Sequence, residues 1–383
     1  MNPEIPGLSK LYIEPTNLCN LNCRTCIRNT WDEPLGQMES PVWDKIIQGL
    51  SSFSPRPKVF FGGFGEPLFH PRIIDMIKQV KEIGARAELI TNGTLLTKDL
   101  SRELLGTGID VLWVSLDGAK PESYSDIRLG AELPQVLENL TNLDKMIFSM
   151  GTTPWGELTP VRVFNTELGI CFVAMKRNIA ELPTVLSIGR QLHATRYNVS
   201  NVLPYTPEML NEVLYNSTLT RGFYLDTLET AQLKLPRIDE DEYTSIPLYC
   251  ARNSEMTVTW PGHEYNIPSH RCPFIEEGAA AIAWDGGFSP CPQLLHNYTT
   301  YIVEHKRFSY HWTIGNVKER SLIDLWNGPD HQAFRERVHK FIFPPCTVCG
   351  GCDFSDTNES DCEGNGFPTC GGCLWARGVI QCP

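Results

Sequence analysis

Short apolar runs alternate with amphipathic helical patterns from the start of the chain to residue 203. The apolar runs cover residues 11–16, 58–63, 87–92, 110–116, 168–175 and 195–203. Between them, apolar side chains recur at helical spacing over residues 42–50, 73–83, 96–105, 133–146 and 179–192. Regular alternation of this kind predicts parallel strands joined by right-handed crossovers. Six such units indicate an α/β fold, a partial (β/α)6 TIM-like barrel.

The regular alternation stops after residue 203. Residues 147–166, rich in Pro, Gly and Thr, are predicted to be an insertion, and residues 204–271 show no clear units. From Cys272 onward Cys, Gly and Pro dominate, apart from one helix predicted over residues 322–341. So few apolar segments cannot easily form a core, and bound metal would supply the missing constraint. We therefore predict a barrel over 1–203, a connecting segment over 204–271 and a small cysteine-rich iron–sulfur domain over 272–383.

Composition and charge narrow the class of protein. The 383 residues are 42% hydrophobic and 20% charged, which is typical of soluble proteins. A net charge of −12 argues against nucleic acid or an anionic membrane as the partner. The sequence contains no apolar run long enough to span a bilayer, and its start lacks the features of a secretory signal. These features predict a cytoplasmic protein.

Disulfides are rare in the cytosol, so the 14 cysteines call for another explanation. Cys19, Cys23 and Cys26 follow the first predicted strand at the spacing C-x3-C-x2-C. In barrel enzymes the loops at this end of the strands carry the chemistry. Cysteine thiolates commonly bind [4Fe–4S] clusters, and three of them would leave one iron without a protein ligand. A zinc site, or three unrelated thiols, is the alternative interpretation of this triad.

The cysteine spacing resembles the hallmark of the radical SAM superfamily, and the resemblance extends over about residues 11–203. The segment GGFGEP at residues 62–67 follows the second strand and is similar to the glycine-rich segment of that family. The resemblance implies that S-adenosylmethionine binds beside the cluster and is cleaved reductively to a 5′-deoxyadenosyl radical, which abstracts a substrate hydrogen. A reductant such as ferredoxin or flavodoxin would supply the electron. The implied cosubstrate-binding residues lie at the ends of the second, third and fourth strands and are Gly62, Gly63, Gly65, Glu66, Asn92, Ser115 and Asp117.

The later cysteines resemble a second known pattern. Cys272-x13-Gly286-x4-Cys291 is similar to the opening of the SPASM domain, an appendage of radical SAM enzymes. The resemblance implies two auxiliary [4Fe–4S] clusters, with one thiol to spare, and their ligands would come from Cys272, Cys291, Cys346, Cys349, Cys352, Cys362, Cys370, Cys373 and Cys382. The later spacing departs from the usual pattern, so the ligands cannot be allotted to either cluster.

A structural zinc ribbon is a rival interpretation of part of this region. Cys346-x2-Cys349 and Cys370-x2-Cys373 have the spacing of its two knuckles. Zinc would leave the three other late cysteines unexplained. Of the two cysteines outside both groups, Cys171 lies in an apolar run and is expected to pack in the core.

The sequence gives limited information on the substrate. Relatives with SPASM domains often modify peptides, but the sequence Cys291-Pro292-Gln293-Leu294 lacks the acidic base that sulfatase-maturing enzymes place there. Residues 23–38 and 370–383 are similar to the maturases linked with tungsten-containing aldehyde ferredoxin oxidoreductases. That resemblance implies a pterin cofactor or its oxidoreductase as the substrate. Modification of a ribosomally made peptide or another protein remains an alternative.

A non-catalytic iron–sulfur scaffold or electron carrier is the alternative of a different class. The complete GGFGEP segment favours the enzyme, because a carrier has no use for a cosubstrate site. Arg24, Arg28 and Trp31 stand beside the cysteine loop. We expect them to pack this loop and to pair with Asp32 or Glu33 rather than to bind an anion.

Overall fold

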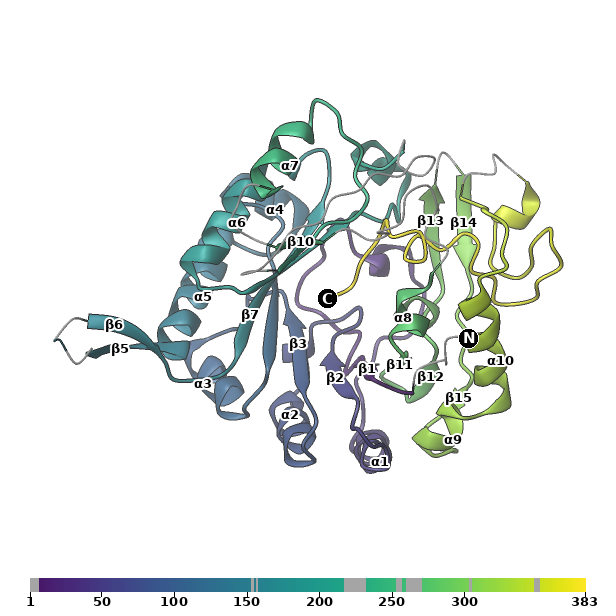
Figure 1. Ribbon diagram of the computed structural model, residues 1–383, viewed down its shortest axis with the longest axis horizontal. Helices are drawn as coiled ribbons and strands as arrows, with labels where there is room; N and C mark the ends of the chain where they lie inside the picture. Colours follow the sequence, from purple (N-terminus) through teal and green to yellow (C-terminus); the bar gives the residue numbers. More distant parts are fainter. Residues whose placement is uncertain are drawn as a thin grey trace.

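One large sheet dominates the computed structural model, which describes residues 7–152, 155, 158–216, 232–252, 257–259, 271–302, 305–347 and 352–383 (Figure 1). In this part of the chain its strand order is β10-β9-β8-β7-β4-β3-β2-β1-β11-β12-β15. The strands of the sheet are β1 (Lys10–Ile13), β2 (Lys58–Phe61), β3 (Ala87–Thr91), β4 (Val111–Ser115), β7 (Glu167–Ala174), β8 (Arg196–Asn201), β9 (Gln232–Lys234), β10 (Thr257–Thr259), β11 (Ala279–Ile282), β12 (Gly287–Ser289) and β15 (Gly315–Asn316). Two separate hairpins are formed by β5 (Phe148–Thr152) with β6 (Leu158–Arg162) and by β13 (Tyr298–Ile302) with β14 (His305–Ser309).

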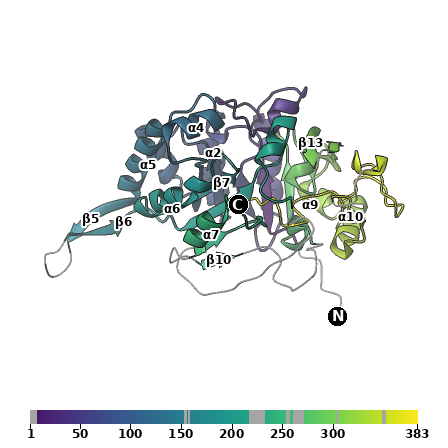
Figure 2. The same cartoon turned by 90° about the horizontal axis from the view of Figure 1, so that it is seen from above.

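Helices cover the outer face of the sheet (Figures 1 and 2). The α-helices are α1 (Ser40–Leu50), α2 (Ile73–Glu82), α3 (Lys98–Gly106), α4 (Pro121–Ile127), α5 (Leu133–Ile147), α6 (Leu182–Gln191), α7 (Ser245–Arg252), α8 (Pro273–Glu276), α9 (Leu322–Trp326) and α10 (Pro329–Lys340). Short 3₁₀ helices are η1 (Ile27–Thr30), η2 (Pro67–Phe69), η3 (Ile179–Glu181), η4 (Pro207–Glu212), η5 (Pro292–Leu294) and η6 (Asp353–Ser355).

The predicted partial barrel is confirmed. The six expected strands, β1, β2, β3, β4, β7 and β8, are neighbours in chain order, and every pair among them is parallel. Their connecting helices are amphipathic, as in α2, where Ile73, Met76, Ile77 and Val80 form one buried stripe. In the described residues the sheet ends at β10 and β15 and does not close on itself.

The sheet extends beyond the predicted barrel on both sides. Strands β9 and β10, within the predicted connecting segment, continue it past β8, and β11 pairs in parallel with β1. These additions escaped the pattern analysis because β9 and β10 have three residues each and β11 is mostly alanine. The cysteine-rich region is therefore joined to the barrel by backbone hydrogen bonds.

Two other segments differ in detail from the expectations. The predicted insertion contains the β5–β6 hairpin, which projects from the side of the molecule (Figure 2). The single helix expected over residues 322–341 is wrong, since α9 and α10 are separate helices. Gly328 and Pro329 cause the break, because proline lacks the N–H that a continuous helix needs and is favoured at a helix start.

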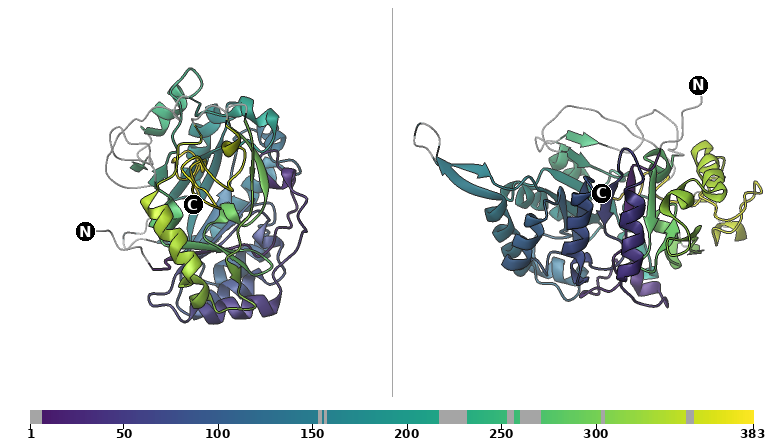
Figure 3. Two further views of the ribbon diagram at one scale, coloured as in Figure 1. Left: turned by 90° about the vertical axis from the view of Figure 1, so that its right-hand side faces the viewer. Right: turned by 90° about the horizontal axis from the view of Figure 1, so that it is seen from below.

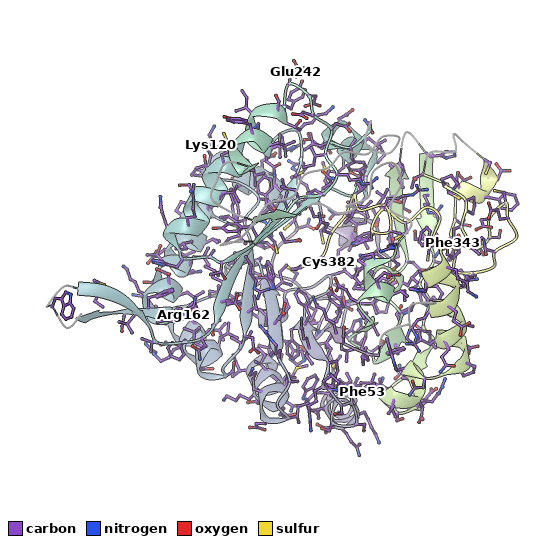
Figure 4. All side chains as sticks on the ribbon, viewed as in Figure 1. Phe53, Lys120, Arg162, Glu242, Phe343 and Cys382 are labelled. Carbon is purple, nitrogen blue, oxygen red and sulfur yellow. The ribbon has the colours of Figure 1, made fainter. Side chains whose placement is uncertain are left out.

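The two faces of the sheet pack against different partners. In β1, Leu11 and Ile13 belong to the core beneath the helices, whereas Tyr12 points to the inner face and packs with Phe274 of the C-terminal region. The C-terminal residues cross this inner face, and the chain ends near the middle of the molecule (Figure 3). Cys382 is seen there in Figure 4, far from Arg162 on the projecting hairpin. The described helices include none that is both long and apolar enough to cross a membrane.

Candidate functional site

The loop that follows β1 carries the first three cysteines. The backbone turns tightly here, because Cys26 N–H donates to the Cys23 carbonyl at 3.1 Å and Asn29 Nδ2 donates to the same carbonyl at 2.9 Å. All three thiols are half-buried. Burial raises the pKa of Cys26 to about 11 and also raises the pKa of Cys23, and the neighbouring thiols add to both shifts. The turn thus gathers Cys19, Cys23 and Cys26 at one end of the sheet.

This triad fits a cluster better than a single ion. Thiols with raised pKa values become thiolates at neutral pH only when a metal displaces their protons. Among the described residues, no three His, Cys, Asp or Glu side chains converge closely enough to hold one metal ion. In a [4Fe–4S] cluster each thiolate binds a different iron, so its ligands need not converge on one point.

The glycine-rich segment after β2 lies against the cysteine loop. A Cβ atom on Gly65 would lie 2.6 Å from the Leu18 carbonyl oxygen and would also meet the Thr16 carbonyl. Gly63 has a φ of 114°, and its Cβ would lie 2.8 Å from that of Glu14. Sequence reasoning assigned these glycines to the cosubstrate, but the structure gives Gly63 and Gly65 a further reason to be glycine. Gly65 allows two loops to touch through their backbones, and Gly63 leaves room for the Glu14 side chain.

Glu66 and Asn92 fasten these loops together. Glu66 is 2% exposed, and its carboxylate accepts hydrogen bonds from the N–H groups of Leu68 at 3.0 Å and Asn92 at 2.7 Å. Burial raises the pKa of Glu66, although both hydrogen bonds oppose the shift. The Asn92 amide donates to Asn20 at 3.0 Å and lies 3.9 Å from the Cys19 sulfur. The predicted residues of the second and third strand ends therefore meet at the cysteine loop.

Asp117 is also brought to this end of the sheet, but its carboxylate is already bonded within the protein. Its Oδ1 accepts from Val173 N–H at 2.7 Å, and its Oδ2 lies 2.6 Å from Arg128 Nη2. Asp117 is fully buried, and the ion pair with Arg128 compensates its charge. Ser115, at the end of β4, is half-buried.

Sequence reasoning missed Arg128. This residue follows α4, a helix that was not predicted, and it is 8% exposed. Burial disfavours its charge, but Asp117 outweighs this effect and raises the pKa of Arg128. Burial raises the pKa of Cys23, and the Arg128 charge opposes that shift, which places the guanidinium close to the cysteine loop. An arginine shortly after a strand-end aspartate was the signal that could have revealed it.

The expected partners of Arg24 were wrong. Arg24 pairs with Asp126 of α4 at 3.0 Å rather than with Asp32 or Glu33. The unpredicted helix α4 brings Asp126 over the cysteine loop, while Glu33 bonds to His296. Arg28 packs the loop as expected, donating to the Leu21 carbonyl at 3.4 Å.

The late cysteines divide into two neighbouring sets. The four that line one pocket, together with Tyr298 and Arg307, are Cys272, Cys291, Cys370 and Cys373. Burial raises the pKa of each of these thiols, and for Cys291 the other three thiols raise it further.

The second set contains Cys346, Cys352 and Cys362. Burial raises the pKa of Cys346, and Cys362 and Cys352 contribute to the shift. Cys349 lies outside the described residues.

Cys382 does not line the pocket of the first set, and its sulfur accepts a hydrogen bond from the Gln293 amide at 3.9 Å. Cys171 is buried in β7, and Cys250 is exposed on α7. Cys370 and Cys373 line the pocket together with Cys272 and Cys291, which a zinc ribbon would not use.

Comparisons with known proteins agree with this arrangement. The family model of the radical SAM superfamily matches residues 13–155, and that of the SPASM iron–sulfur cluster-binding domain matches residues 272–353. The chain is 32% identical to the tungsten-containing aldehyde ferredoxin oxidoreductase cofactor-modifying protein of Pyrococcus furiosus, over 97% of this chain and 96% of that protein. It is 28% identical to the AdoMet-dependent heme synthase of Methanosarcina barkeri, over 88% of this chain and 86% of that protein.

Solved structures share the fold at low sequence identity. Streptococcus suis SuiB bound to its precursor peptide SuiA has a TM-score of 0.58 and 15% identity, covering 91% of this chain and 72% of that one. The enzyme anSMEcpe with bound AdoMet has the same TM-score and identity, covering 91% and 88%. The matched family models, the near full-length relative and the cysteine loop lead to one conclusion: the chain is an enzyme of the radical SAM superfamily that carries a SPASM domain, and it uses an iron–sulfur cluster and S-adenosylmethionine.

Proposed function

We propose that this enzyme matures a tungsten-dependent aldehyde oxidoreductase or the cofactor of that oxidoreductase. The observation that carries the proposal is the likeness to the Pyrococcus furiosus cofactor-modifying protein, which runs through 97% of the chain. It includes most of the sequence outside the two matched family models, at residues 156–271 and 354–383. Substrate specificity is expected to depend on such regions, because the superfamily models describe what all members share.

Cys19, Cys23 and Cys26 would hold the cluster that binds the cosubstrate. When bound, the cluster and S-adenosylmethionine supply a radical that removes a hydrogen atom from the substrate, after one electron arrives from a donor such as ferredoxin or flavodoxin. Around them, the backbone of Gly62 and Gly63 would receive the methionine end of the cosubstrate.

Ser115 and the Asn92 side chain would line the rest of the cosubstrate site. Arg128 is a buried positive charge near Cys23, and we assign it to the cosubstrate carboxylate. Asp117 would then act by holding Arg128 in place rather than by touching the cosubstrate.

Two alternatives have less support. Modification of a ribosomal peptide draws on the likeness to SuiB, which at 15% identity reflects the fold alone. A scaffold without catalysis would not need the contacts that bring Gly63, Gly65 and Glu66 to the cysteine loop. The 5′-deoxyadenosine assay tests the scaffold alternative, and co-production with an oxidoreductase tests the peptide alternative.

The radical chemistry is tested by measuring 5′-deoxyadenosine. Protein reconstituted without oxygen and mixed with dithionite and S-adenosylmethionine is expected to form it. Cys23→Ala removes one of three cluster ligands and should lower formation at least a hundredfold. Cys250→Ala is the matched control, because Cys250 is exposed on α7 and should leave the rate unchanged. A wild-type protein that forms none would contradict the proposal.

The substrate is tested by co-production with a tungsten-dependent aldehyde oxidoreductase in a host that lacks this chain. Aldehyde oxidation is expected with the wild type and not with Cys23→Ala. Chromatography and mass spectrometry of the released cofactor would identify the change made. Equal oxidation in the absence of this chain would reject the tungsten assignment while leaving the radical chemistry intact.

We also propose that the two late cysteine sets hold two auxiliary clusters, with Cys382 as the spare thiol. Cys272→Ser should lose about four iron atoms per chain, the content of one cluster. Cys382→Ser should keep the wild-type iron content, because Cys382 does not line the pocket of the first set and its sulfur accepts from the Gln293 amide. Iron and zinc are counted by mass spectrometry of the purified protein. Equal iron loss in both variants, or zinc in place of iron, would refute this assignment.

A further inference from the structure

A chain of two carboxylates and one imidazole connects the barrel to the C-terminal region. His296 Nε2 lies 2.8 Å from a Glu14 oxygen, and its Nδ1 lies 2.5 Å from a Glu33 oxygen. Glu14 follows β1, Glu33 follows η1, and His296 follows η5, so three distant segments meet. Glu14 is 1% exposed and His296 is 4% exposed, so these contacts are shielded from water.

The imidazole carries a positive charge at neutral pH. Burial by itself would lower its pKa, but Glu14 and then Glu33 outweigh burial and raise the pKa of His296 to about 9. Both ring nitrogens then donate, one to each carboxylate. Trp31 covers the ring at a centroid distance of 4.3 Å, and Phe64 meets its edge at 5.6 Å. His311 also acts on this cluster, since it lowers the pKa of Glu33.

Glu14 also holds the glycine-rich segment. The oxygen that does not face His296 accepts a hydrogen bond from Phe64 N–H at 3.1 Å. The side chain of Glu14 fills the space that a Cβ on Gly63 would occupy. The Glu14 carboxylate therefore makes two contacts. One oxygen bonds to His296 of the C-terminal region, and the other bonds to Phe64 in the loop expected to receive S-adenosylmethionine.

Glu33 completes the connection on the other side. Its second oxygen accepts from Asn297 N–H at 2.7 Å, so both Glu33 oxygens bond to consecutive residues after η5. Glu33 belongs to the segment that continues from the cysteine loop. The contacts of Glu14 and Glu33 thus hold the C-terminal region against the glycine-rich loop and the cysteine loop, which would surround the cosubstrate.

We propose that His296 is a positioning residue for S-adenosylmethionine binding, because it orients Glu14 and, through Glu14, the backbone at Gly63 and Phe64. Cosubstrate affinity then depends on the docking of the SPASM domain onto the barrel. The inference rests on the proposed role of the glycine-rich segment. Without the imidazolium, the buried Glu14 loses the positive charge bonded to it, and its hold on the Phe64 N–H is weakened.

The test compares His296→Gln with His193→Gln, a histidine of the barrel that pairs with Asp144 of α5. Equilibrium dialysis with labelled S-adenosylmethionine measures affinity at pH 7.5, and iron content is measured in parallel. We expect at least a tenfold loss of affinity for His296→Gln, with iron content kept and the rate at saturating cosubstrate within threefold of wild type. His193→Gln should bind as wild type does.

The pH dependence separates positioning from a merely structural role. The positive charge is present below pH 9 and is lost as the pH rises through that value, so wild-type affinity should fall there. His296→Gln lacks this group, and the difference between the two proteins should shrink above pH 9. The cosubstrate itself also loses a proton as the pH rises. This loss changes the affinity of both proteins equally, so it cancels when the two are compared.

The outcomes distinguish this inference from the proposed function. Unchanged affinity in His296→Gln overturns the positioning role, even if the wild type forms 5′-deoxyadenosine normally. A wild type that forms none refutes the proposed radical chemistry, whereas the binding result stands by itself. If His296→Gln fails to fold, Glu33→Gln decides the question, because it keeps His296 and Glu14. It should lower affinity severalfold, and no change would overturn the inference.

Discussion

Replacing Arg128 with methionine is expected to destabilise the protein by about 3–5 kcal/mol, because it leaves the Asp117 carboxylate buried without its partner. Asp117 is 0% exposed and lies 2.6 Å from the guanidinium. Its other oxygen still accepts from Val173 N–H, but one hydrogen bond does not replace water and a full positive charge. Urea unfolding of the reconstituted protein, kept free of oxygen and followed by circular dichroism, measures the loss.

The double variant Asp117→Asn with Arg128→Met is the control for this prediction. It removes the unpaired charge while keeping similar side-chain volumes, so it should recover at least half of the lost stability. A single variant that loses less than about 1 kcal/mol would mean that water reaches Asp117 and that the pair is not buried as described.

Replacing Gly65 with alanine is expected to abolish the cluster at the cysteine loop. The added Cβ would press on the carbonyls of Thr16 and Leu18, which are backbone atoms and cannot turn aside as a side chain can. The cysteine loop must then move as a whole, and Cys19, which follows Leu18 directly, moves with it. We expect a loss of about four iron atoms per chain and loss of 5′-deoxyadenosine formation.

Gly106→Ala is the matched control for the glycine variant. Gly106 ends α3, and a Cβ placed on it meets no atom within 4 Å. Alanine there should be neutral or slightly stabilising, because it reduces the freedom of the unfolded chain. Full iron content in Gly65→Ala would show that the two loops do not touch as the structure has them.

The barrel could be predicted because a short continuous stretch of sequence determines each of its strands and helices. Each strand is one apolar run and each outer helix one amphipathic pattern, as in β4 and α2, so periodicity alone finds them. The cysteine spacing and the glycine-rich segment are also continuous stretches. The resemblance to the radical SAM family rested on such stretches, and the comparisons confirm it.

What escaped prediction depends on contacts between distant residues. The pairing of β11 with β1 joins Ala279 to Lys10, and the bond of His296 to Glu14 spans 282 positions. No local pattern encodes either contact. The ion pair of Asp117 with Arg128 was likewise missed, because Arg128 follows α4, a helix that no local pattern predicted. The late cysteines could not be grouped because the cavity that joins Cys272 to Cys370 is formed by folding alone.

We propose that three thiolates hold a cluster whose remaining iron binds the cosubstrate directly. Electron–nuclear double resonance of the reduced protein, with S-adenosylmethionine isotopically labelled at its amino nitrogen and carboxylate, tests this most directly. We expect the label to couple to the cluster spin in the wild type and not in Cys23→Ala. A wild-type cluster that shows no coupling to bound label would contradict it.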